Sequence, residues 1–211
     1  QQAMYERLIT GMDRRLRLAL TIAMALLLVA DLAYSGYQYY HQALEGDIAG
    51  IVLPSEGYTR VLDDPFGISV LTDGETYPAT NRYFAHAAMA GWFRTMPFLL
   101  QNFMEPLDSI YFSAAMAKLL MHLLLLLMLG MYVSGSTRIA GFDLLLGMVL
   151  VTPLFHNWGS GMYIGFIDYS VTYAFFYALP MGLLMLFFLP YFLEGFHGGK
   201  ECSGPIPLSC L

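Results

Sequence analysis

Long apolar runs are the feature of this sequence that most limits what it can fold into. The first run, from Leu16 to Gly36, matches the ~20 residues that a helix needs to cross a bilayer. Over all 211 residues, 57% are hydrophobic and 12% are charged, whereas soluble domains average about 45–50% and about 25%. The sequence therefore predicts an all-α polytopic integral membrane protein.

About four transmembrane helices are expected, with a large outer loop that contains interfacial helices. The predicted segments are a cytoplasmic N-terminus at 1–15, spans at 16–36, 109–133, 139–155 and 163–193, the outer loop at 37–108 and a cytoplasmic tail at 194–211. Pro180 and Pro190 interrupt the last span, so that span should kink or tilt. The chain starts without Met and ends in a tail rich in Gly, Pro and Ser, which suggests a fragment.

Charge sets the expected orientation. Arg14, Arg15 and Arg17 precede the first run, and the positive-inside rule then puts the N-terminus in the cytoplasm. The segment 37–107 holds eight acidic residues and three arginines, which fits the outer face. No basic patch of the kind that binds nucleic acid is present, so we expect membrane lipid, and not nucleic acid, as a partner.

An acidic pair, Glu45 and Asp47, follows the first span within the sequence YQYYHQALEGDIAGIVLP. At a membrane surface, partial desolvation can tune the proton affinity of a carboxylate, as a general base acting on a lipid-linked substrate requires. Two acids in a solvated loop would give the same pattern. Both interpretations stay open on the residues alone.

The segment 81–103 is rich in Ala, Met and aromatic residues and predicts an interfacial helix, kinked near Pro97. Arg82 and His86 lie four residues apart, so they share a helical face that could hold a phosphate or simply contact lipid headgroups. The remaining candidates for substrate binding are Arg94, His156 and Asp168. No metal-ligand spacing is found, and no metal site is predicted.

Polar residues inside the apolar runs support a competing function. Asp31 is expected to extend outward from the first span, whereas Lys118 and His122, four residues apart, should face another helix. A non-catalytic transporter or membrane-assembly subunit would use such residues to line a path or to pair helices. The residues concerned are Asp31, Lys118, His122, Asp143 and Asp168. A third alternative is an acyltransferase with His86 or His156 as its base.

The order of one span, an acidic outer loop and interfacial helices, together with the sequence HQALEGDIAGIV, resembles the GT-C class of membrane glycosyltransferases over roughly residues 14–135. The resemblance implies transfer of a sugar from a polyprenyl-phosphate carrier to an acceptor at the outer membrane face. It implies Asp47 as the general base, with Glu45 the weaker candidate.

The resemblance also implies that the arginines and His86, or a divalent cation, stabilise the departing phosphate, and that the polyprenyl tail lies along the spans. Two features depart from the family pattern. Gly46 separates acids that are adjacent in many members, and the family has many more spans than four.

Overall fold

The computed structural model describes residues 12–45, 47–53, 61–75, 80–156 and 166–197. Within these ranges the chain forms helices and no strand. Three helical stretches are long and apolar enough to cross a membrane: Arg14–Tyr40 (α2), Pro106–Ser134 (α8) and Val171–Phe196. This architecture is consistent with the predicted all-α membrane protein.

The expected third span is shorter than the other three. It comprises α9, Phe142–Val151, and the 3₁₀-helix η1, Thr152–Phe155, and together these fall below the length of a full crossing. The described residues therefore contain three candidate spans, and a fourth span at 139–155 stays a prediction.

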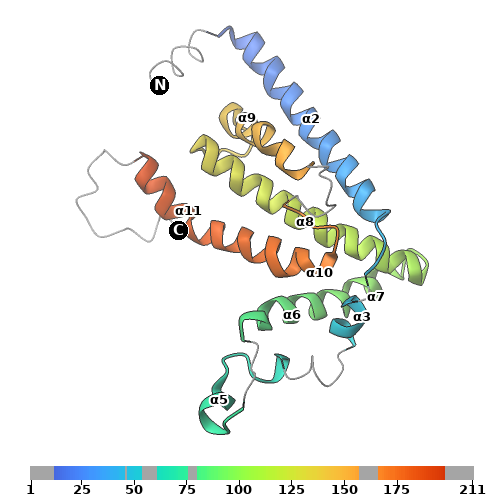
Figure 1. Cartoon of the computed structure of the whole chain (residues 1–211). Coiled ribbons are helices and arrows are strands. Elements are labelled where there is room, and N and C mark those ends of the chain that lie inside the picture. Colours follow the sequence, from blue (N-terminus) through green and yellow to red (C-terminus); the bar gives the residue numbers. More distant parts are fainter. Residues whose placement is uncertain (1–11, 46, 54–60, 76–79, 157–165, 198–211) are drawn as a thin grey trace.

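Helix α8 lies at the centre of the bundle and packs against α2, α9 and α11, which comprises Leu179–His197 (Figure 1). The Tyr40 hydroxyl donates to Asp108 Oδ1 at 3.5 Å, so the end of α2 lies beside the start of α8 and the two helices are antiparallel. At the opposite end, the guanidinium of Arg17 lies 5.5 Å from the centre of the Phe142 ring. We call the end where α2 finishes and α8 begins the Tyr40 end.

Local signals explain the limits of α8. Pro106 occupies its first turn, where a missing N–H removes no helical hydrogen bond. Gly135 ends the helix with φ of 63°, a left-handed conformation that favours glycine. A Cβ at Gly135 would also lie 2.2 Å from the Phe196 ring, so the end of α11 packs closely on the end of α8.

The last candidate span comprises three helical pieces. It begins with α10, Val171–Tyr173, continues through the π-helical turn η2, Ala174–Ala178, and ends with α11. Pro180 lies two residues after the end of η2 and has no N–H for the usual hydrogen bond one turn back, which explains a widened turn at this place. The helical stretch runs from Val171 to His197, so within the described residues it begins and ends later than the predicted span 163–193. Residues 163–165 of that prediction lie outside the described ranges.

The predicted outer loop forms a group of short helices beyond the Tyr40 end (Figure 1). They are α3 (Asp47–Val52), α5 (Ile68–Thr72), α6 (Thr80–Phe93) and α7 (Met96–Leu100). Helix α6 packs against α3 and η2, and α7 packs against α8. The expected interfacial helix at 81–103 is thus helical but divided, because the chain breaks just before Pro97, which lies in the first turn of α7.

Candidate functional site

The two acids of the EGD sequence lie at the Tyr40 end in different surroundings. Asp47 is the first residue of α3, and its side chain is exposed, so the protein itself does not supply the partial desolvation expected of a general base at this position. Glu45 is partly buried, and its Oε1 accepts a hydrogen bond of 2.8 Å from the backbone N–H of Thr172. Glu45 is therefore held against α10, and the Asp47 carboxylate remains accessible.

Lys118 is the central cation of this end of the bundle. It lies in α8 and is 2% exposed. Its Nζ donates to Gln42 Oε1 at 2.5 Å and to the backbone carbonyl of Tyr169. The carboxylates of Glu45 and Asp168 lie close enough to attract its charge. A buried ammonium needs such partners, because an unpaired one is costly to desolvate.

Asp168 belongs to the segment that leads into α10. Its Oδ1 accepts a hydrogen bond of 2.7 Å from the backbone N–H of Ser170, and the Ser170 hydroxyl in turn caps α10 by accepting from the Tyr173 N–H. The structure thus brings two of the predicted site residues, Asp168 and Glu45, together around Lys118.

Two further polar pairs lie deeper between the helices. The Tyr39 hydroxyl and His122 Nδ1 share a hydrogen bond of 3.0 Å, and the His122 ring stacks on Phe155 with 4.1 Å between centroids. His156 Nε2 donates to Asp31 Oδ1 at 2.6 Å. The expectation that Asp31 extends outward is wrong, because its side chain is 13% exposed and turns toward His156. His156 therefore pairs with Asp31, away from the acids of the outer loop.

Two buried atoms in this deeper group lack a hydrogen-bond partner among the described residues: Asp31 Oδ2 and His122 Nε2. Such atoms are uncommon in folded proteins and call for a specific explanation. Asp143 lies elsewhere, in the first turn of α9 near the Arg17 end of the bundle.

The predicted cations Arg82 and His86 lie in α6 and Arg94 directly follows it, but they do not form one site. Arg82 is exposed, whereas His86, one turn later, is 3% exposed and its ring meets Phe176 edge-on at 4.9 Å. Burial, together with the nearby charge of Arg82, lowers the pKa of His86 below its ordinary value. A buried neutral imidazole is a poor phosphate ligand, so the shared Arg82 and His86 face is not formed as expected.

Arg94 is tied to the outer-loop helices instead. It is exposed, and its Nε donates to the backbone carbonyl of Val52 at 3.1 Å, which satisfies an acceptor at the end of α3. Val52 lies five residues after Asp47, so this bond holds Arg94 at a point about 7.5 Å along α3 from Asp47.

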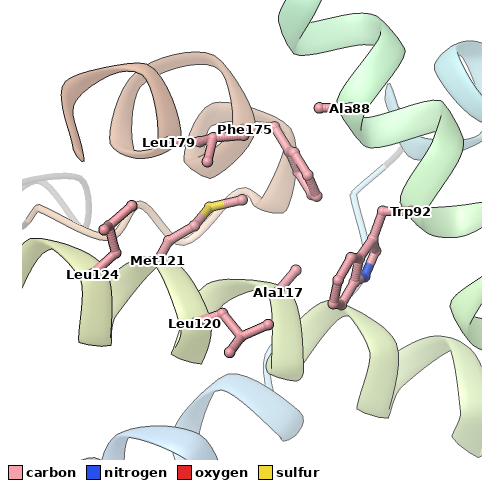
Figure 2. A pocket seen from close by; sticks show the side chains of 8 residues that line it. All are labelled: Ala88, Trp92, Ala117, Leu120, Met121, Leu124, Phe175 and Leu179. Carbon is pink, nitrogen blue, oxygen red and sulfur yellow. The ribbon is translucent and has the colours of Figure 1, made fainter. Parts of the chain in front are cut away.

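An apolar pocket of about 270 Å³ lies between α6, α8 and the start of the last span (Figure 2). Ala88 and Ala117 are small, Trp92 and Phe175 form two of its walls, and the Met121 side chain points from α8 toward Phe175. The remaining lining residues are Leu120, Leu124 and Leu179. The indole Nε1 of Trp92 donates to the Ser113 carbonyl at 3.1 Å, which fixes that wall.

Sequence reasoning named Lys118 only as a polar residue within a span, and it missed the partners of Lys118. Gln42, Tyr169 and Thr172 carry no sequence signal that would separate them from ordinary interfacial residues. Among the described residues, no three His, Cys, Asp or Glu side chains gather in a way that could hold a metal ion. Comparison with known protein families, with curated proteins and with solved structures finds no match to this chain.

Proposed function

We propose that this protein is a membrane glycosyltransferase that moves a sugar from a polyprenyl-phosphate carrier to an acceptor hydroxyl, with Asp47 as general base. The observation that carries the proposal is the contrast between the two acids: Glu45 is bonded to Thr172, whereas Asp47 is exposed just beyond candidate span α2. A base that serves an incoming acceptor has to be accessible, and Asp47 meets this condition.

The chemistry assigned to Asp47 is one proton transfer coupled to one displacement. The acceptor oxygen attacks the anomeric carbon while Asp47 takes its proton, and the bond from that carbon to the phosphate oxygen breaks with its electron pair leaving on the phosphate. Attack from the opposite face inverts the anomeric configuration. The negative charge that grows on the phosphate needs donors, and one exposed guanidinium group, that of Arg82 or that of Arg94, is suited to supply them.

The apolar pocket supports a lipid-linked substrate. Its lining is hydrocarbon and aromatic, and it lies between α6, from the predicted interfacial segment, and two candidate spans. A polyprenyl chain is a flexible hydrocarbon that can pack in such a pocket, where it would exchange contacts with lipid tails for van der Waals contacts with these side chains. His86 takes no direct part in this scheme, because it is buried.

The test compares Asp47→Asn, Glu45→Gln and Asp73→Asn in the full-length protein, reconstituted in nanodiscs with a panel of polyprenyl-phosphate sugars. Asp47→Asn removes the proton acceptor and should lower kcat about 10²–10⁴-fold. Glu45→Gln should cost much less, because a glutamine oxygen can still accept from Thr172. Asp73→Asn is the matched control, since Asp73 is an exposed aspartate of the same segment. Activity of Asp47→Asn near that of the parent would overturn the assignment.

A second candidate is a transporter or membrane-assembly subunit, and the deeper polar pairs favour it. Ionisable residues within spans commonly mark ion or proton paths, and here Asp31 pairs with His156 while His122 pairs with Tyr39. Under this function, Asp31→Asn would abolish transport or assembly, whereas Asp47→Asn would leave it intact.

A further inference from the structure

Lys118 connects two loops that are distant in the sequence. It projects from α8, and its Nζ bonds Gln42, 76 residues away, and the carbonyl of Tyr169, 51 residues away. Gln42 lies in the short connection between α2 and α3, and Tyr169 lies in the segment just before α10. A single buried ammonium thus joins three parts of the chain.

Two more hydrogen bonds join the same two loops. The Ala43 backbone N–H donates to the Tyr169 hydroxyl at 3.2 Å, and the Thr172 N–H donates to Glu45 at 2.8 Å. The rings of Tyr39 and Tyr169 also lie near the ammonium, with 5.7 and 5.6 Å from Nζ to the ring centres. Residues 41–45 are therefore held against residues 168–172, with Lys118 beneath both.

This arrangement holds the chain just before α3. Helix α3 is too short to be stable by itself, and Ile51 is its one buried residue. Ile51 lies in the core, α3 packs on α6, and the bond from Arg94 to Val52 holds its last residue. Asp47, at the other end, lies two residues after Glu45, so the position of its backbone also depends on what holds the connection 41–45.

We infer that Lys118 is a positioning residue, which anchors the connection 41–45 and thereby aims Asp47 at the acceptor. This inference rests on the function proposed above. Lys118 does not touch the substrate; it acts through Gln42, Tyr169 and the attraction to Glu45 and Asp168. Replacing it with an apolar side chain should free the connection without removing the base.

The experiment compares Lys118→Met, Gln42→Leu and the double variant with the parent, and uses Arg138→Met as control. Arg138 is exposed beyond the far end of α8, so its substitution removes one positive charge without touching the anchored loops. Two quantities are measured on the full-length protein in nanodiscs: kcat and KM of transfer, and hydrogen exchange of residues 41–53.

Lys118→Met should lower kcat by up to about 10²-fold, the scale expected when a catalytic group is misplaced by 1 Å, with KM for the carrier unchanged. Hydrogen exchange of the backbone amides in residues 41–53 should become faster than in the parent. The double variant should be no worse than the more severe single one, because both substitutions break the same link. Arg138→Met should match the parent in both measurements.

Hydrogen exchange separates this inference from the function on which it rests. If the parent transfers no sugar but Lys118→Met loosens 41–53, the proposed function fails and the anchor stands. Unchanged exchange in 41–53, or strictly additive effects of the two substitutions, would overturn the anchor. If Lys118→Met does not fold, Gln42→Leu decides, because it removes one contact at the edge of the cluster and leaves the ammonium its carbonyl partner.

Discussion

A close approach between α8 and α9 gives a sharp test of the packing. Gly147 of α9 faces Gly130 of α8, and a Cβ built at Gly147 would lie 2.8 Å from the Gly130 carbonyl oxygen and 3.3 Å from the Ser134 Cβ. That oxygen belongs to the backbone of a long helix and cannot rotate away as a side chain would. Gly147→Ala should therefore force the two helices apart.

The size of the effect follows from two opposing contributions. Overpacking of this kind typically costs about 1–3 kcal/mol, whereas replacing a helical glycine by alanine gains about 1 kcal/mol of intrinsic helix propensity. Gly195→Ala in α11 isolates the second contribution, because nothing lies within 4 Å of a Cβ at Gly195. The difference in unfolding free energy between the two variants should then be about 1–3 kcal/mol, with Gly147→Ala the less stable.

Reversible unfolding in mixed micelles, titrated with sodium dodecyl sulfate and followed by circular dichroism, measures this difference on the full chain. Helix contacts in membranes depend on small residues that let backbones approach, so the comparison also tests whether α9 packs as a membrane helix would. Equal stability of Gly147→Ala and Gly195→Ala would refute the reasoning, because it would mean that α8 and α9 do not touch at these glycines.

Two further predictions concern pH and orientation. Because burial holds the pKa of His86 below its ordinary value, the unfolded chain binds a proton more readily, so the free energy of unfolding should fall as pH drops below about 6.5. His86→Gln should weaken this dependence in chemical unfolding measured at several pH values, and an unchanged slope would contradict it. With Cys202 and Cys210 replaced, an impermeant maleimide should label Asp73→Cys from outside the cell and Arg138→Cys only after permeabilisation. The reverse pattern would invert the orientation.

Local features of the sequence predicted where α2 and α8 lie. The apolar runs at 16–36 and 109–133 correspond to α2 and α8, and the helix limits carry recognisable signals in Pro106 and Gly135. Helix α2 continues to Tyr40 because no Gly or Pro interrupts Tyr37–Tyr40, and interfacial aromatic residues are compatible with a helical backbone. The apolar run therefore predicts the part of the helix that would lie in the bilayer, but it does not predict the residue at which the helix ends.

The contacts between elements could not be predicted in the same way. The four-residue spacing of Lys118 and His122 indicates a shared face, but the partners on that face come from four different segments. Tyr39 and Gln42 come from the end of α2 and the loop after it, Phe155 comes from η1, and Tyr169 comes from the segment before α10. Asp31 shows the same limit, since its partner His156 is 125 residues away. Periodicity identifies faces, and only the tertiary fold identifies what covers them.

The distance of Asp31 from the Tyr40 end of α2 determines how the two candidate functions can be separated. Asp31 lies nine residues before the end of α2, which is about 14 Å along the helix at about 1.5 Å per residue. A sugar bound beside Asp47, beyond that end, is therefore out of reach of the Asp31 carboxylate. If Asp31 matters to a glycosyltransferase, it does so by pairing with His156 and holding η1 against α2, an effect on stability and not on proton transfer. A requirement for Asp31 that persists in a variant with unchanged unfolding free energy would instead place the function inside the helices.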